Sequence, residues 1–414
     1  MNGGAAFLVV YLISTLLVGL PVMIAELALG RRARADAITT LRTLTPPRQP
    51  WWLVGAAGVL ASFLILAFYT EVAGWVIAYI ARAAAGRLGT ADAERMSQEF
   101  QALTTNPWEA LLWQWLVLAL VGGIIIVGVS KGIEQTTKRL MPVLFVLLVL
   151  VGLRSLTLPG AATGLRFLFL PDFSKVTAAT VLTAMGLAFF KLSLGMGTMI
   201  TYGSYFRDDQ HIPATALRVM LADLSVSLLA GIAIFPAVFA FGFEPDAGPA
   251  LLFITIPAVF ASIPLGRIFL VLFFVLAAIA ATGAMLSLLE VPVAFLAERT
   301  RLGRTGATLV TIGLLLPFGA TAALSSSVLA DVQIGGRTFF DLYDFLTSNV
   351  LLPIGGLCIS LFVGWFWGRD AVRRALSNEH TIRNPATISA FYRIIQVVTP
   401  VLVLRVLLNG LGLF

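Results

Sequence analysis

The chain of 414 residues has few charged residues, one cysteine and two histidines. Charged side chains make up 12% of it and hydrophobic ones 59%, which excludes a soluble domain of this size and indicates a polytopic helical membrane protein. The single cysteine, Cys358, lies in an apolar run, so neither a disulfide nor a metal site is indicated. The two histidines lie in charged connecting segments, which argues against a histidine proton relay through the bilayer.

Ten segments are long and apolar enough to cross a membrane, since about 20 apolar residues span the hydrocarbon core. One of the ten is interrupted, at 177–206. They lie near residues 5–30, 52–82, 112–130, 140–158, 177–206, 214–242, 266–297, 305–327, 342–367 and 388–410. We therefore expect an all-α polytopic membrane protein in which residues 1–414 form a single transmembrane domain.

The connecting segments differ in positive charge, which predicts the orientation of the chain. Of the 28 lysines and arginines, 18 fall in alternate segments, namely 31–50, 131–139, 207–218, 299–304 and 369–393. Cytoplasmic loops carry the excess of lysine and arginine, so we expect these five segments to face the cytoplasm. The net charge of +7 is then explained by topology, and no nucleic-acid partner is expected.

The most informative stretch is 189–197, with the sequence Phe-Phe-Lys-Leu-Ser-Leu-Gly-Met-Gly. Its two glycines and Ser193 follow a largely apolar run and weaken the helix, which leaves backbone groups in need of partners. In transporters, such broken helices mark the binding site. Lys191 lies at the break, where a charge costs at least ~2.5 kcal/mol, so we expect it to have a partner and a function. The alternative is a lysine that reaches from a helix end to the membrane surface.

A series of short motifs runs in order along nearly the whole chain. They are Asn2-Gly3-Gly4-Ala5-Ala6-Phe7, Gly19-Leu20-Pro21, Ala25-Glu26-Leu27-Ala28-Leu29-Gly30-Arg31, Phe68-Tyr69, Gly74-Trp75, Ser130-Lys131-Gly132-Ile133-Glu134, Met141-Pro142, Pro171-Asp172-Phe173, Leu192-Ser193-Leu194-Gly195, Ile200-Thr201-Tyr202, Ser204-Tyr205, Leu288-Leu289-Glu290 and Phe345-Leu346-Thr347-Ser348-Asn349. Together they resemble the neurotransmitter:sodium symporter family, in its bacterial amino-acid transporter branch. The resemblance implies the inverted-repeat amino-acid transporter fold and a location in the bacterial plasma (inner) membrane.

By this resemblance, the ten spans correspond to the family's second to eleventh helices, and the break at Lys191 falls in its sixth. The family's first helix, which carries part of the substrate and sodium sites, would precede Asn2. We favour a misassigned start or a truncation as the explanation over a protein that is truly shorter.

The resemblance also implies a substrate site. Tyr69 matches a tyrosine whose hydroxyl contacts the substrate carboxylate, a role that a phenol fills without burying another charge. Phe190 matches an aromatic lid over the substrate, and Ser193 matches a contact in the unwound segment. The residues that would line the pocket for the substrate side chain are Ile65, Met196 and Leu288. This apolar set favours a neutral, hydrophobic amino acid, although aliphatic residues at these positions could equally be core.

The first sodium site departs from the family pattern. Lys191 stands where many relatives have a small polar residue that offers sodium an oxygen, and an ammonium has no acceptor oxygen. Asp223 aligns with an asparagine of the same site. We expect the Lys191 ammonium to occupy the cation position and to pair with Asp223; the alternative is that each charge turns separately towards an aqueous vestibule. Ser227 matches the chloride-site serine of animal relatives, but we expect an ordinary hydrogen-bonded helix serine.

The second sodium site also departs from the pattern. Its pair of hydroxyl residues falls on Gly283 and Ala284, while Thr282 lies one place early and Ala280 could offer only its carbonyl. Two hydroxyls fewer leave a hard cation short of oxygen ligands, which argues against sodium coupling without excluding it. We expect no other metal and no cofactor.

Two further carboxylates match the gates of the family. Asp344 corresponds to the external gate and Glu298 to the internal gate. The arginines that pair with them in relatives belong to the part that would precede Met1, so each gate is half present in this sequence.

The predicted function is secondary active transport of neutral, hydrophobic amino acids by alternating access, with Lys191 and Asp223 replacing the first sodium site. The alternative is a non-transporting amino-acid-binding membrane protein, either a sensor or a vestigial transporter. No set of nucleophile, base and orienting group indicates an enzyme. The expected partners are the lipid bilayer and an amino-acid substrate, and a homodimer stays open.

Overall fold

The computed structural model describes residues 3–90, 92–240, 248–379, 381–382 and 384–413. Over these residues it is helical and has no β-strand beyond an isolated bridge between Ile334 and Arg337. Nine helical stretches in this part of the chain are long and apolar enough to cross a membrane. They are Ala5–Ala33, Trp52–Ala84, Pro107–Val127, Lys131–Leu156, Ile212–Ala240, Gly266–Arg299, Gly303–Ser326, Phe339–Phe366 and Pro385–Gly410. The predicted all-α polytopic fold is confirmed.

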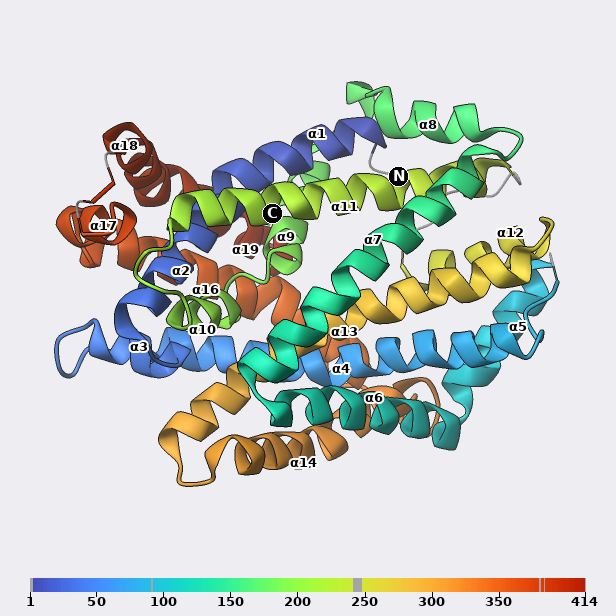
Figure 1. Ribbon diagram of the computed structural model, residues 1–414, viewed down its shortest axis with the longest axis horizontal. Coiled ribbons are helices and arrows are strands. Elements are labelled where there is room, and N and C mark those ends of the chain that lie inside the picture. The colour runs from blue at the N-terminus through green and yellow to red at the C-terminus, as the bar shows by residue number, and fades with distance from the viewer. Residues whose placement is uncertain (1–2, 91, 241–247, 380, 383, 414) are drawn as a thin grey trace.

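Most of these helices run along the long axis of the molecule (Figure 1). The longer stretches contain α1 (Ala5–Ser14), α2 (Leu20–Ala33), α4 (Trp52–Ala84), α6 (Pro107–Val127), α7 (Gln135–Leu156), α11 (Ile212–Ala240), α13 (Gly266–Arg299), α14 (Gly303–Ala323), α15 (Phe339–Asp344), α16 (Leu352–Leu361), α18 (Pro385–Arg393) and α19 (Thr399–Gly410). The shorter helices are α3 (Ala37–Thr43), α5 (Ala93–Thr105), α8 (Ala161–Phe169), α9 (Ala178–Lys191), α10 (Thr198–Ser204), α12 (Ile256–Ala261) and α17 (Arg369–Leu376).

Nine of the ten predicted spans correspond in order to these nine stretches, and they differ from them mainly at their ends. Helix α6 begins at Pro107, earlier than predicted, because the Asn106 side chain accepts hydrogen bonds from the amides of Trp108 and Glu109. Proline suits this first helical position since its missing N–H would have no partner there. The end of the predicted span 214–242 and Asn2 of the first motif lie outside the described residues.

The interrupted span predicted at 177–206 is broken into α9 and α10, as expected. Between these helices, Ser193, Gly195 and Gly197 have positive φ angles of 54°, 73° and 75°. The unwound backbone finds partners on two other helices. The Gly195 amide donates to Glu26 Oε1 of α2 at 2.8 Å, and Ser62 Oγ of α4 donates to the Met196 carbonyl at 2.6 Å. These side chains satisfy backbone groups that the break would otherwise leave unpaired.

Helices α2 and α10 approach each other through two glycines. A Cβ on Gly30 would lie 1.9 Å from the Ile200 carbonyl oxygen, and a Cβ on Gly203 would lie 2.5 Å from the Leu27 carbonyl oxygen. Both distances are too short for any side chain. The second half of the broken helix therefore lies directly against α2 because both contact positions are glycine.

A buried ion pair holds the other side of α10. Glu290 of α13 is fully buried and accepts hydrogen bonds from Arg304 Nη1 at 2.9 Å and from the Tyr205 hydroxyl at 2.5 Å. Arg304 also donates through Nε to the Ile125 carbonyl of α6 at 2.9 Å. The Glu290–Arg304 pair thus joins α13, α14, α6 and the residue that follows α10.

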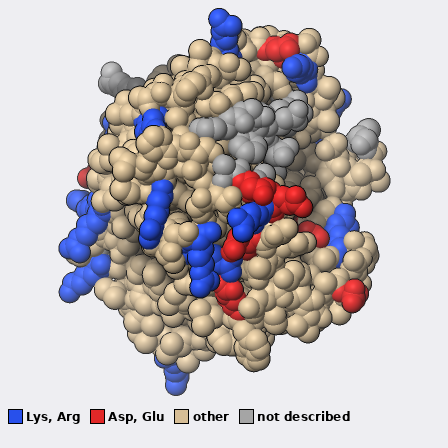
Figure 2. Space-filling view, turned by 90° about the vertical axis from the view of Figure 1, so that its right-hand side faces the viewer, with Lys and Arg blue, Asp and Glu red and all other residues tan. Residues whose placement is uncertain are grey.

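Three of the five basic segments meet at one end of the molecule. Arg31 of segment 31–50 donates to the Gln210 carbonyl at 2.7 Å and to Asn378 Oδ1 at 2.9 Å, which links it to segments 207–218 and 369–393. This end is at the left in Figure 1, near α3, α10 and α17. Figure 2 shows the opposite end, where charges of both signs are scattered over a mostly uncharged surface. Which side of the membrane the basic end faces stays a prediction.

The glycine contact between α2 and α10 can be tested with a matched pair of variants. Gly30→Ala forces its Cβ against the Ile200 carbonyl, so we expect a loss of about 1–3 kcal/mol and a lower melting temperature in detergent. In Gly123→Ala, also in a helix, the added Cβ has no atom within 4 Å. That control should melt at or slightly above the wild-type temperature, since alanine favours helix over glycine. Equal melting of the two variants would contradict the proposed close contact.

Candidate functional site

A cavity of about 200 Å³ lies beside the break between α9 and α10. Its wall is formed by α4, α13 and the two sides of the break. The lining residues are Ile65, Tyr69, Phe190, Lys191, Ser193, Met196, Ala284 and Leu288. The structure thus brings together around one cavity all six residues that the sequence analysis assigns to a substrate site. Their contact with a substrate stays a prediction.

The wall of this cavity is mostly apolar, with a few polar groups. Ile65, Met196 and Leu288 are buried, with 1%, 2% and 5% of their surfaces exposed. Tyr69 lies one helical turn after Ile65 on α4, so both side chains are on the same side of that helix. Together with Ser193 it adds hydroxyl groups to this wall. Pockets for drug-sized ligands measure roughly 300–1,000 Å³, so this cavity suits a smaller molecule with one apolar part.

Lys191 and Asp223 form an ion pair next to this cavity. Lys191 Nζ lies 3.3 Å from Asp223 Oδ2, and the two side chains are 27% and 23% exposed. Lys191 Nζ also donates a hydrogen bond to Ser227 Oγ, and Ser227 in turn donates to the Asp223 carbonyl at 2.6 Å. The two charges therefore contact each other and do not turn separately towards an aqueous vestibule. Ser227 bonds to Lys191 as well as to its own helix. That the pair replaces a sodium ion stays a prediction.

Sequence reasoning missed a fourth member of this cluster, Tyr11 of α1. Its hydroxyl donates to Asp223 Oδ2 at 3.1 Å, and its ring centroid lies 5.1 Å from Lys191 Nζ, within cation–π distance. Tyr11 is 2% exposed. The one available signal was a tyrosine within an apolar span, since a buried phenol usually needs a hydrogen-bond partner. Which partner it takes depends on how α1 packs against α9 and α11.

The groups around Lys191 fit an ammonium better than a sodium ion. An ammonium has three donors and no acceptor, and it finds here a carboxylate, a hydroxyl and an aromatic face. Sodium needs oxygen ligands, and the side chain at this position cannot supply one. Whether a sodium ion binds at the position that the sequence analysis assigns to these residues stays a prediction.

The residues assigned to the second sodium position lie along α13. Thr282 is the only one of the four with a side-chain oxygen, and its hydroxyl donates to the Ala278 carbonyl at 2.8 Å. Ala280 and Ala284 are exposed, while the Gly283 carbonyl accepts from Ser287 Oγ at 3.2 Å. This part of α13 therefore offers one hydroxyl and some backbone carbonyls.

The two carboxylates assigned to the gates lie in different places. Asp344 lines a second cavity of about 370 Å³, which also has Phe190 in its wall, and it accepts from Ser348 Oγ at 2.8 Å. Glu298 accepts from the Asp36 amide at 2.8 Å, near the basic end. Neither carboxylate forms an ion pair with a basic side chain of the described residues.

Comparisons with known proteins agree with the predicted family. The chain matches the sequence model of the Sodium:neurotransmitter symporter family over residues 1–99 and 89–413. It is 38% identical over 412 residues to the uncharacterized sodium-dependent transporter YhdH of Bacillus subtilis, covering 100% of this chain and 91% of YhdH. It is 32% identical over 420 residues to an uncharacterized sodium-dependent transporter of Haemophilus influenzae, covering 99% and 91% of the two chains.

A solved structure agrees as well. The crystal structure of MhsT in complex with L-phenylalanine superposes with a TM-score of 0.90 at 41% identity, covering 99% of this chain and 92% of that one. The apolar helices and the bacterial relatives make this an integral protein of the bacterial plasma membrane. From the family match along the chain, the similar relatives and the shared structure, we conclude that this protein belongs to the sodium:neurotransmitter symporter family of membrane transporters.

Proposed function

We propose that this protein is a secondary transporter of neutral, hydrophobic amino acids, working by alternating access around the cavity at the α9–α10 break. The observation that carries the proposal is the wall of that cavity, which combines two hydroxyls and an unwound backbone with buried aliphatic side chains. The similarity to MhsT, which was solved with L-phenylalanine, supports the same class of substrate.

In this proposal the two kinds of wall bind the two ends of the substrate. The Tyr69 hydroxyl donates to the substrate carboxylate, with Ser193 and the unwound backbone beside it. Ile65, Met196 and Leu288 pack against the substrate side chain. Phe190 borders both this cavity and the second cavity, which Asp344 lines. It separates the bound substrate from the outside of the cell. The gate carboxylates Asp344 and Glu298 lie on the outer and inner routes.

The ion coupling in this proposal differs from that implied by the family name. The Lys191 ammonium holds the position of the first sodium ion and pairs with the Asp223 carboxylate at 3.3 Å. Because the charge is covalently attached, it cannot be released with the substrate in each cycle. Transport is then coupled to a sodium ion at the second sodium position, to protons, or to no ion. Transport requires both members of the pair, because removing one leaves the other charge without its partner, at a cost of ~3–5 kcal/mol.

Uptake by the full-length protein in proteoliposomes tests the coupling. We expect L-phenylalanine to be accumulated, and sodium removal to reduce its uptake only in part. Uptake that collapses without sodium and ignores the pH gradient would contradict the role of Lys191. Binding of L-phenylalanine without any flux would instead favour an amino-acid-binding protein that does not transport, which is the alternative function.

The role of Tyr69 can be measured by ligand affinity. Tyr69→Phe removes the hydroxyl that donates to the substrate carboxylate, and hydrogen bonds to charged groups contribute about 1.5–3 kcal/mol. We expect L-phenylalanine to bind roughly tenfold or more weakly, measured by calorimetry or scintillation proximity. The control Tyr392→Phe removes a hydroxyl that donates to the Gly364 carbonyl at 2.9 Å, outside the cavity. It should leave the affinity unchanged; an equal loss in both variants would refute the assignment.

The Lys191–Asp223 pair can be tested by removing and replacing it. Lys191→Met leaves the Asp223 carboxylate without its counter-ion, so we expect uptake to fall at least tenfold. The double variant Lys191→Ser, Asp223→Asn supplies two neutral oxygen-bearing side chains instead, and it should recover uptake that now requires sodium. Lys138→Met, which breaks an exposed ion pair with Glu134, is the matched control and should transport like the wild type. A double variant as inactive as Lys191→Met, or active without sodium, would contradict the replacement of sodium by lysine.

A further inference from the structure

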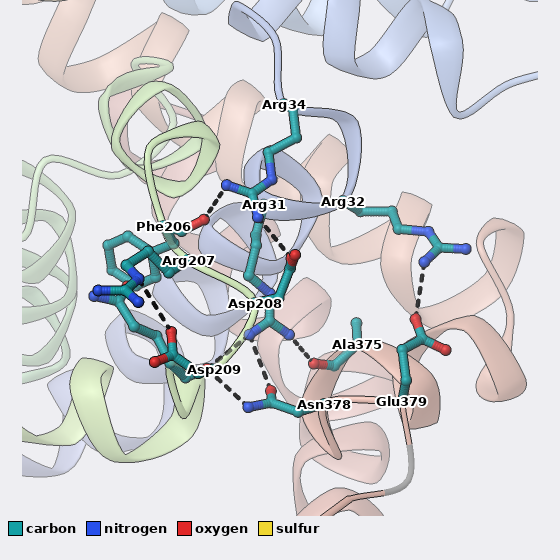
Figure 3. Close-up of polar contacts among 11 residues, drawn as sticks. Arg31, Arg32, Arg34, Phe206, Arg207, Asp208, Asp209, Ala375, Asn378 and Glu379 are labelled. Carbon is teal, nitrogen blue, oxygen red and sulfur yellow. Dashed lines mark hydrogen bonds and ion pairs between the residues drawn. The ribbon is translucent and has the colours of Figure 1, made fainter.

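A larger cavity, of about 810 Å³, lies at the basic end of the molecule. It is bordered by the end of α2, the segment after α10, and α17 with the residues that follow it. The lining residues are Ala28, Arg31, Arg32, Arg34, Asp208, Asp209, Arg374, Ala375, Asn378, Glu379, Thr381 and Ile382. Figure 3 shows the side chains from these three segments converging. The transport mechanism proposed above uses none of them.

The carboxylates of this cavity are each paired with a different arginine. Glu379 lies 2.8 Å from Arg32, and Asp208 lies 2.6 Å from Arg34. The third carboxylate, Asp209, lies 3.6 Å from Arg207 (Figure 3). Two guanidinium groups in the wall, those of Arg31 and Arg374, are left without a carboxylate within ion-pair distance among the described residues. The wall therefore carries an excess of positive charge.

Arg31 is the buried one of these two arginines, with 7% of its surface exposed. Its guanidinium donates to the Ala375 carbonyl and to Asn378 Oδ1, as Figure 3 shows, and it also donates to the Gln210 carbonyl. All three acceptors are neutral, so they orient the group without cancelling its charge. An arginine has five N–H donors, so two remain for a further partner. A buried charge without a counter-ion is costly, which favours an anion in the cavity.

Arg374 is the exposed one of the two arginines. It lies four residues before Asn378, which Arg31 contacts, and its side chain makes no hydrogen bond or ion pair with the described residues. Guanidinium groups bind phosphate oxygens through parallel pairs of N–H donors, which suits two arginines in one wall. The charge of a phosphate group, one or two negative units, matches two uncancelled guanidinium groups.

We propose that this cavity binds a phosphate group, held by Arg31 and Arg374. The basic segments around it are those that the orientation of the chain places at the cytoplasmic side, where anionic phospholipid headgroups are present. The headgroup of such a lipid is one source of the phosphate, and a soluble phosphate is the other. Either would join α2 to α17 at the point where both contact the segment after α10.

Melting of the full-length protein in detergent tests this proposal with defined probes. The probes are phosphatidylglycerol, the zwitterionic phosphatidylcholine as lipid control, and inorganic phosphate. We expect phosphatidylglycerol to raise the melting temperature more than phosphatidylcholine does, with an apparent affinity about tenfold weaker in Arg374→Gln. Arg374 is exposed, so its replacement should leave the fold intact. Arg373→Gln, next to it on α17 and outside the cavity wall, should keep the wild-type affinity.

The possible outcomes distinguish a lipid headgroup, a soluble phosphate and the absence of a specific anion site. Stabilisation by phosphatidylglycerol alone, lost in Arg374→Gln, assigns the site to a lipid headgroup. Stabilisation by inorganic phosphate with the same dependence on Arg374 assigns it to a soluble phosphate. No anion-specific stabilisation, or equal losses in Arg373→Gln and Arg374→Gln, would overturn the proposal and reduce the effect to general surface charge.

Discussion

The site depends above all on the satisfaction of a broken backbone inside an apolar helix bundle. Unpaired amide and carbonyl groups are costly away from water, so the segment between α9 and α10 persists only where other helices supply partners. Glu26 accepts the Gly195 amide, and Ser62 donates to the Met196 carbonyl. Glu26 lies on α2, against which α10 packs, and Ser62 lies on α4. The break and its surroundings are therefore one structural unit.

The break also decides where Lys191 can lie. Lys191 is the last residue of α9, and its ammonium reaches Asp223 and Ser227 on α11 and the ring of Tyr11 on α1. Three helices thus surround one charge beside a small, mostly apolar cavity. A partly buried ion pair of this kind contributes little net stability, so its presence is better explained by the proposed transport function than by folding.

The two ends of the molecule differ in how their charges are arranged. At the basic end, arginines of α2 and of the segment after it meet carboxylates and carbonyls from segments more than 170 residues away in the chain. At the opposite end, Arg82 pairs with Glu99 and Glu109, which are close to it in sequence. The basic end therefore links distant parts of the chain, including the segment that follows α10.

The sequence by itself determined the class of protein, the order of the spans, the position of the break and the family. These follow from local properties: apolar length, glycine and proline positions, and charge asymmetry between segments. The six predicted substrate residues could be named from motifs, but only the tertiary structure placed them around one cavity. The start of α6 was missed because an asparagine cap, and not hydropathy, decides it.

Tyr11 and the arginines of the basic end were not predicted as partners of anything. Their contacts join residues 212 and 347 positions apart, and no local pattern encodes such pairs. The same holds for Gly30, whose need to be glycine appears only when Ile200 is placed against it. The sequence therefore specifies which helices form and where one must break. Packing between distant helices decides which polar groups meet there, because that depends on the positions of all of them at once.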